Sequence, residues 1–169
     1  MALPDPLEIV PVAGPLDAVV SVPGSKSITN RALVCAALAD GPSELVGPLQ
    51  ADDTEAMVEG LRSLGIDVTP LWEEARIRLH GVAGRPTADV ALVDARLSGT
   101  TSRFLLPVAG LGEGVRRLDG ANRMRARPMG DALDAVRALG ADVTEVGAAG
   151  HLPVEIGRAS CRERVFVGV

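Results

Sequence analysis

Lys26 is the only lysine in this 169-residue sequence, and it lies in a loop rich in glycine and serine, directly before an apolar run. The free N–H groups and the dipole at a helix N-terminus favour a bound anion. A lysine ammonium is compact and can give up its proton when its surroundings lower its pKa, which arginine does not do. We expect an anion site here, with Ser25 as the helix N-cap and Ser27 and Arg31 as further donors.

A second loop supports this interpretation, because a lone loop lysine is explained equally well by simple solvation. The stretch Leu-Ser-Gly-Thr-Thr-Ser-Arg-Phe at residues 97–104 again places small polar residues and a basic residue before an apolar run. Gly99, Thr100, Ser102 and Arg103 offer the same chemistry as the first loop. The glycine spacing of a nucleotide-binding P-loop is absent.

Other residues that carry charge have simpler explanations. Arg123, Arg125 and Arg127 would point to one side if their segment were extended, although a solvated run of charge is the alternative. Asp52 and Asp53 are most simply explained as a helix cap. The histidines and cysteines have no metal-site spacing, so we expect no metal site.

An internal repeat organises the chain. Residues 52–69 and 127–144 are similar at an offset of about 75 positions, and both end in Leu-Gly-x-Asp-Val-Thr. Each copy reads as a loop, a helix, a strand, a second helix and a strand, which predicts an α/β or α+β fold with helices packed on sheets. Gly65 and Gly140 are expected to end the second helices in a left-handed conformation. Strands are expected near residues 67–69, 76–79, 90–93, 115–118, 142–145 and 152–156.

Composition excludes several classes of function. A formal net charge of −5 argues against nucleic acid or an anionic membrane as a partner, and 2% aromatic residues argue against base stacking. We expect no signal peptide and no membrane span, and Cys35 is expected in the core. A reducing cytoplasm fits these features.

The loops resemble those of the enolpyruvyl transferases, and among them the family of 5-enolpyruvylshikimate-3-phosphate synthases. The resemblance rests on PGSKSITNRALVCAALADG, LSGTTSRF and RMRARPMGDAL, which occur in the family's order. It implies two domains, each of three similar helix–sheet units, of which this chain would hold about two units in truncated form. Residues 1–21 would join the second domain, residues 22–157 would form part of the first, and residues 158–169 would be a foreign or disordered tail.

The resemblance also implies a reaction. The family moves the enolpyruvyl group of phosphoenolpyruvate to the 5-hydroxyl of shikimate 3-phosphate and releases phosphate, without a cofactor. Glyphosate is the expected inhibitor, a cytoplasmic monomer is the expected state of the full-length enzyme, and the fragment alone is expected to be inactive.

Residue roles follow from the matching motifs. Lys26 and Asp53 would be catalytic. The substrates would be held by Lys26, Ser27, Arg31, Gly99, Thr100 and Arg123, with Arg103 and Arg127 in support. Leu97 departs from the family, because many members have asparagine there.

Two alternatives stay open. The sister transferase that acts on UDP-N-acetylglucosamine shares the fold and the loop lysine, but its loop usually reads Gly-Ala-Lys-Asn, where this chain has Gly-Ser-Lys-Ser. The other alternative is a fragment that binds anions without catalysis.

Overall fold

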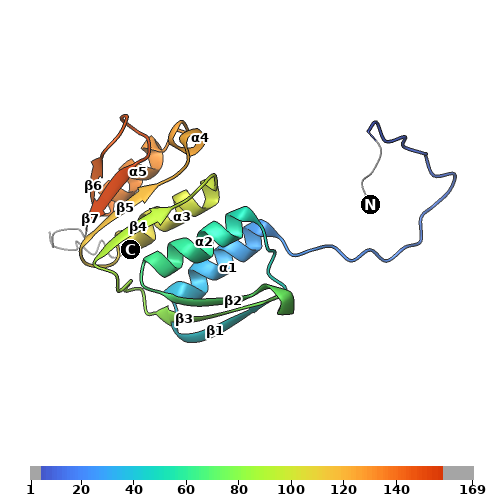
Figure 1. The fold of residues 1–169 in the computed structure, drawn as a ribbon, viewed down its shortest axis with the longest axis horizontal. Coiled ribbons are helices and arrows are strands. Elements are labelled where there is room, and N and C mark those ends of the chain that lie inside the picture. Colours follow the sequence, from blue (N-terminus) through green and yellow to red (C-terminus); the bar gives the residue numbers. More distant parts are fainter. Residues whose placement is uncertain (1–4, 158–169) are drawn as a thin grey trace, which may run out of the picture.

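The computed structural model describes residues 5–157. From Lys26 onward they form two helix-and-sheet units, which can be followed by the colours of Figure 1. In the first unit, α1 and α2 cover one face of a three-stranded antiparallel sheet with the order β1-β3-β2. The bounds of this unit are α1 Lys26–Leu38, β1 Asp40–Val46, α2 Asp52–Ser63, β2 Asp67–Leu71, a 3-10 turn at Trp72–Glu74, and β3 Arg76–Val82.

The second unit is built on a four-stranded mixed sheet with the order β4-β5-β7-β6. Strands β4 and β5 are parallel, and the other two pairs are antiparallel. Its bounds are β4 Val90–Asp94, α3 Gly99–Ala109, β5 Val115–Asp119, α4 Asn122–Arg125, α5 Gly130–Ala138, β6 Asp142–Glu145 and β7 Val154–Gly157. The mixed helix–sheet architecture predicted from the repeat is therefore confirmed.

The repeat glycines adopt the predicted conformation. Gly65 and Gly140 have φ angles of +84° and +95°, in the left-handed region that glycine occupies without a steric penalty. Each follows a second helix, α2 or α5, and turns the chain into a strand.

The N-terminus of α2 differs from the prediction. Ala51 occupies the cap position, and the Thr54 hydroxyl accepts a hydrogen bond from the Ala51 N–H at 2.9 Å. Asp52 and Asp53 are instead the first two helical residues, where carboxylates favour the positive end of the helix dipole. Capping by Thr54 leaves the Asp53 side chain available for other contacts.

A continuous core joins the two units. Met57 and Leu61 of α2 belong to the same buried cluster as Val93 of β4 and Leu105 of α3. Gly60 permits this packing, because a Cβ there would lie 2.4 Å from the Leu105 side chain. Helix α2 thus packs between the first sheet, α1 and the second unit, which fixes the N-termini of α1, α2 and α3 relative to one another.

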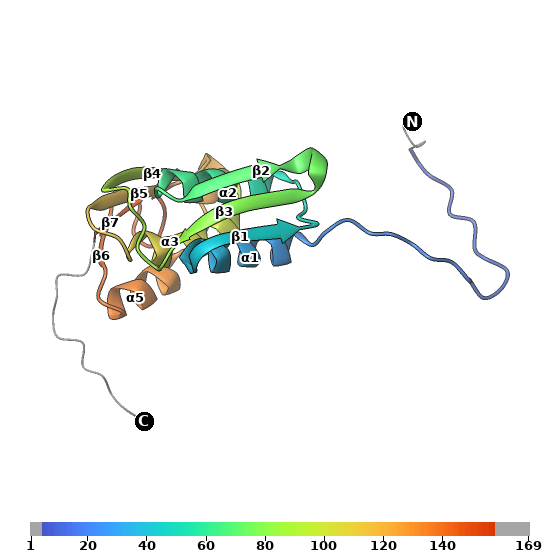
Figure 2. The ribbon, with the colours of Figure 1, turned by 90° about the horizontal axis from the view of Figure 1, so that it is seen from below.

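The segment before α1 leaves the body of the molecule. The structure shows neither a helix nor a strand between Asp5 and Ser25, and this segment runs away from both sheets in two perpendicular views (Figures 1 and 2). The predicted joining of residues 1–21 to another domain stays a prediction. The predicted foreign tail at 158–169 lies outside the described residues.

Two details correct the sequence analysis. Cys35 is exposed rather than part of the core, because the buried face of α1 carries Leu33 and Ala37 on the other side of the helix. The last strand runs from Val154 to Gly157, two residues later than it was expected to begin. No helix in the described part of the chain combines the length and apolar character needed to cross a bilayer.

Candidate active site

The two predicted loops face one open hollow of about 500 Å³. Ser25 caps α1 by accepting the Ile28 N–H, and Ser98 caps α3 by accepting the Thr101 N–H. The first two N–H groups of each helix remain beside the hollow, where they and the helix dipoles favour a bound anion. The lining residues are Lys26, Ser27, Arg31, Asp53, Leu97, Gly99, Thr100, Arg103, Phe104 and Arg127.

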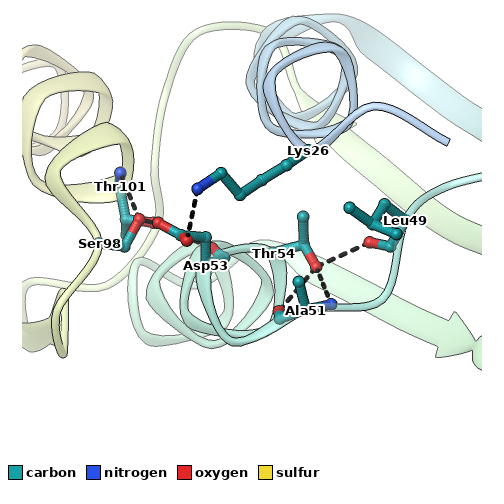
Figure 3. Close-up of polar contacts among 7 residues, drawn as sticks. All are labelled: Lys26, Leu49, Ala51, Asp53, Thr54, Ser98 and Thr101. Atoms are coloured by element: carbon teal, nitrogen blue, oxygen red, sulfur yellow. Dashed lines mark hydrogen bonds and ion pairs between the residues drawn. The ribbon is translucent and has the colours of Figure 1, made fainter. Parts of the chain in front are cut away.

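Lys26 and Asp53 form the ion pair at the centre of Figure 3. The Lys26 Nζ lies 2.9 Å from Asp53 Oδ2, and the two side chains are 46% and 25% exposed. Partial burial raises the pKa of Asp53, but hydrogen bonds from Ser98 and Lys26, together with the charges of Lys26 and Arg127, outweigh burial and hold the pKa below its ordinary value. The structure thus presents an ammonium and an ionised carboxylate side by side.

Arg31 is held in place by two contacts. Its Nη1 donates to the Ser27 carbonyl at 2.9 Å, and its guanidinium carbon lies 5.3 Å from the centre of the Phe104 ring. A cation stacked on an aromatic face is attracted by the ring quadrupole. These contacts orient a planar fork that can bind a carboxylate or phosphate with two parallel hydrogen bonds.

Gly99 lies beneath two arginines. A Cβ at this position would lie 3.0 Å from Arg127 Nη1 and 3.4 Å from Arg103 Nη1. The other end of the Arg103 guanidinium donates to the Pro128 carbonyl at 3.2 Å. Two cations therefore approach the N-terminus of α3 at a position where a larger residue would displace them.

Two residues of the predicted loops and clusters, Ser102 and Arg123, do not line the hollow. Ser102 is fully buried, and its hydroxyl donates to the Gly99 carbonyl at 3.0 Å. Arg123 lies on α4, so the extended conformation that would align the three arginines is not adopted at residues 122–125. Arg125 instead pairs with Asp119 through two hydrogen bonds of 2.8 Å. Arg127 is the member of this cluster that reaches the hollow.

Two residues that line the hollow and one beneath it had no role predicted from the sequence. Phe104 supports Arg31, and Leu97 contributes an apolar side chain that is 55% exposed. Ser98 is almost fully buried and caps α3. The sequence does carry a signal for Ser98, because a serine directly before a helix is a common N-cap. No comparable signal places Phe104 against an arginine 73 positions earlier.

The charges at the hollow define what it can bind. Four cations, Lys26, Arg31, Arg103 and Arg127, face a single carboxylate, Asp53. In the described part of the chain, no three histidine, cysteine, aspartate or glutamate side chains gather as a metal site would require. The hollow is suited to a ligand with several negative charges.

Comparison with known proteins agrees with this geometry. The family model described as EPSP synthase (3-phosphoshikimate 1-carboxyvinyltransferase) matches residues 11–166. The chain belongs to the EPSP synthase family. Relatives in this family named 3-phosphoshikimate 1-carboxyvinyltransferase include those of Nostoc punctiforme, 45% identical over 152 residues, and Opitutus terrae, 43% identical over 161 residues. The alignments cover 90% and 92% of this chain but only 36% and 37% of those proteins, so the chain spans about a third of their length.

Solved structures of the EPSP synthase family share the fold. The EPSP synthase from Acinetobacter baumannii superposes with a TM-score of 0.74 at 25% identity, over 82% of this chain and 31% of that one. The enolpyruvyl transferase NikO from Streptomyces tendae superposes with a TM-score of 0.53 at 18% identity, over 79% of this chain and 29% of NikO, which shows similarity of fold alone.

Proposed function

We propose that the hollow is the first-domain half of an active site that transfers the enolpyruvyl group of phosphoenolpyruvate to the 5-hydroxyl of shikimate 3-phosphate. The observation that carries the proposal is the meeting of two capped helix N-termini and four cations around one hollow. Both substrates bear a carboxylate and a phosphate, which need this concentration of donors and positive charge. The relatives' shared name supplies the substrate class.

The reaction is an addition followed by an elimination. The 5-hydroxyl loses its proton as its oxygen bonds to C2 of phosphoenolpyruvate, and C3 gains a proton, which gives a tetrahedral intermediate. C3 then loses a proton as the bond from C2 to the phosphate oxygen breaks, and phosphate leaves. Proton movement is required in both steps, so acid–base groups must lie beside the reacting carbons.

The residues divide these tasks as follows. Lys26 binds phosphoenolpyruvate and carries a proton, with Asp53 as its carboxylate partner at 2.9 Å. Arg31 and Ser27 hold shikimate 3-phosphate, with Arg31 gripping its carboxylate. The second loop forms the phosphoenolpyruvate pocket through Gly99 and Thr100.

Three arginines complete the proposed site. Arg103 and Arg127 lie over the N-terminus of α3 and support the phosphoenolpyruvate pocket. Arg123 is assigned to phosphoenolpyruvate by its place in the family's motif alone, because it lies on α4 and does not line the hollow. The proposal includes glyphosate as a competitor at the phosphoenolpyruvate pocket, and a cytoplasmic monomer as the full-length enzyme.

Calorimetry with three ligands tests the proposal. Shikimate 3-phosphate should bind the chain, phosphoenolpyruvate should bind it in the presence of shikimate 3-phosphate, and UDP-N-acetylglucosamine should not bind. Arg31→Ala should weaken shikimate 3-phosphate binding by about ten- to a hundredfold, because a charge-assisted hydrogen bond is lost. Arg117→Ala, on the outward side of β5, is the matched control.

Each contrary outcome has a distinct meaning. Binding of UDP-N-acetylglucosamine in preference to shikimate 3-phosphate would assign the chain to the sister reaction. If neither shikimate 3-phosphate nor UDP-N-acetylglucosamine binds, the proposed site is contradicted. It is also contradicted if the Arg31→Ala variant binds shikimate 3-phosphate as tightly as the wild-type chain does.

A further inference from the structure

Buried polar side chains gather where the three helices around the hollow begin. Six of the seven buried polar or charged residues that the structure describes lie at the starts of α1, α2 and α3, and only Arg116 lies elsewhere. The six are Thr29, Asn30, Thr54, Ser98, Thr101 and Ser102. Burying a polar group costs free energy unless it is hydrogen-bonded. The partners of these side chains therefore indicate why they are buried here.

Two threonines of this group join α1 and α2 through the backbone of one residue. The Thr29 hydroxyl of α1 accepts the Leu49 N–H at 3.0 Å. The Thr54 hydroxyl of α2 lies 2.8 Å from the Leu49 carbonyl, to which it can donate (Figure 3). Both threonines are buried, at 5% and 0% exposure. The two polar groups of the Leu49 backbone are thus held from opposite helices.

Thr101 makes the corresponding link between α3 and α2. Its hydroxyl is fully buried and lies 3.2 Å from the Asp53 backbone carbonyl and 2.8 Å from the Ser98 hydroxyl (Figure 3). Because a hydroxyl has one proton, Thr101 can donate to the Asp53 carbonyl while it accepts from Ser98. The start of α3 is therefore bonded to α2 at the residue whose carboxylate faces Lys26.

We propose that Thr29, Thr54 and Thr101 are positioning residues, which hold the starts of α1, α2 and α3 at the separation that places Lys26 against Asp53. None of the three threonines lines the hollow, so each acts through the residues that do. The inference about the ion pair rests on the contacts alone, whereas its value for catalysis rests on the proposed function.

The ion pair cannot supply this positioning by itself. The Lys26 and Asp53 side chains are 46% and 25% exposed, and ion pairs that reach water contribute little to stability. A buried backbone group that loses its hydrogen bond costs more, because no water replaces the lost partner. The buried threonine contacts are therefore the stronger restraint, and the 2.9 Å contact between Lys26 and Asp53 follows from them.

The single lysine makes a direct test possible. Lysine labelled with carbon-13 at Cε gives one lysine signal, from Lys26, whose chemical shift follows the ionisation of the carboxylate beside it. Valine has nearly the shape of threonine but no hydroxyl. In Thr54→Val and Thr101→Val the acid inflection of this signal should move to higher pH, because a carboxylate held less closely to an ammonium is protonated more readily. Thr54→Ser and Thr101→Ser keep the hydroxyl and should restore the wild-type inflection.

The other charges around Asp53 are the same in every variant. Those that line the hollow with its carboxylate are Lys26, Arg31, Arg103 and Arg127, and α2 itself carries Asp52 and Glu55. Because threonine, valine and serine are all uncharged, a displaced inflection reports a change in the position of the carboxylate or in its solvation, not a change in the charges present.

Two further variants separate this effect from folding. Thr29→Val removes an acceptor three residues after Lys26, so it stands in if the other valine variants do not fold. Thr87→Val removes a threonine hydroxyl that donates to the Gly65 carbonyl at 2.9 Å, away from the hollow, and should leave the inflection unchanged. Circular dichroism identifies the folded variants. Wild-type inflections in the folded valine variants of Thr29, Thr54 and Thr101 would overturn the proposal.

Calorimetry on the same samples distinguishes this inference from the proposed function. If the inflection follows the threonine hydroxyls but shikimate 3-phosphate does not bind, the positioning inference stands and the proposed function fails. If shikimate 3-phosphate binds while the inflection ignores the threonine hydroxyls, the function stands and the positioning inference fails.

Discussion

At the scale of single residues, the chemistry proposed for the hollow depends on Lys26 being a lysine. Its Nζ lies 2.9 Å from Asp53 Oδ2. Its compact ammonium group lies in the hollow, which three arginines also line. A guanidinium is wider, planar and effectively always protonated, so it can neither repeat this contact nor carry a proton.

We predict that Lys26→Arg disables the full-length enzyme almost as severely as Lys26→Ala. Turnover should fall by about two to four orders of magnitude in both variants, because a group acting in the transition state is lost. Steady-state phosphate release measures the effect, with circular dichroism as the folding control. Near-native turnover of Lys26→Arg would mean that the position supplies only positive charge.

Arg96 has a left-handed backbone conformation, which is unfavourable for any residue that carries a Cβ atom. Its φ angle is +50°, in the left-handed region, while its guanidinium pairs with Glu59 at 2.7 Å and Glu55 at 3.7 Å. We predict that Arg96→Gly is more stable to chemical denaturation than Arg96→Ala by about 1 kcal/mol. Both variants lose the same exposed ion pairs, but only glycine relieves the backbone. Equal stability of the two variants would show that the backbone is unstrained there.

At the scale of elements, Arg116 joins the two units from inside the protein. The residue is fully buried on β5, and it donates to the carbonyls of Ala109 at the end of α3 and of Pro86 and Ala88 in the connection between β3 and β4. Through these hydrogen bonds, Arg116 links the segment between β3 and β4 to the C-terminal end of α3.

We predict that Arg116→Ala lowers the free energy of unfolding by about 2–4 kcal/mol, because buried carbonyl groups lose their donors. Arg117→Ala, its neighbour on the outward face of the same strand, should cost less than about 1 kcal/mol. Urea denaturation of both variants measures the difference. Equal losses would indicate that Arg116 contributes no more than a surface arginine.

Asp119 holds the short helix α4 to the end of β5. Its carboxylate accepts two bonds from Arg125 and one from the Gly120 N–H, each 2.8 Å long. Burial raises the pKa of Asp119, but these donors and the charges of Arg125 and Arg117 outweigh burial and lower it. A lowered pKa contributes stability above the unfolded value of about 3.9, and that stability is lost as pH falls through the folded pKa.

We therefore predict that Asp119→Asn destabilises the chain by about 1 kcal/mol at pH 7. The gap between variant and wild type should close as pH falls below about 4, because the wild-type carboxyl then becomes neutral as well. Asp134→Asn removes a more exposed carboxylate from α5 and serves as the control. A gap that stays constant with pH would contradict the electrostatic explanation.

Sequence patterns predicted the elements better than the contacts between them. The repeat at 75 positions and the glycines after α2 and α5 reflect local backbone preferences, which a sequence displays directly. Arg116 was unpredictable, because arginines are mostly exposed and only the packed fold supplies carbonyls around this one. The cap of α2 was mistaken because Thr54 and Asp53 both suit a helix start, and their roles depend on Lys26 lying opposite.

At the scale of the whole molecule, the hollow is open to solvent and forms only one side of the proposed site. The Lys26 side chain is nearly half exposed, and the lining comes from α1, α2, the loop before α3, α3 itself and the segment after α4. Water around exposed charges weakens the electrostatic interactions that stabilise a transition state, and it competes with each donor for the substrate.

We predict from this openness that the 169-residue chain binds its anionic substrates but does not turn them over. The alignment covers only 36% of the Nostoc punctiforme relative, and we expect the additional length of such a protein to cover the hollow and exclude water. Phosphate release, measured with phosphoenolpyruvate and shikimate 3-phosphate together, should equal that of a Lys26→Ala control for this chain and exceed it by at least about a hundredfold for a protein of the relatives' full length. Both proteins contain the same hollow and differ only in what surrounds it. The difference in phosphate release therefore measures the contribution of enclosure and of added ligands.

Phosphate release by the 169-residue chain above that of its Lys26→Ala control would show that the open hollow is sufficient for catalysis. In that case proton transfer by Lys26, rather than the exclusion of water, would contribute most to the rate.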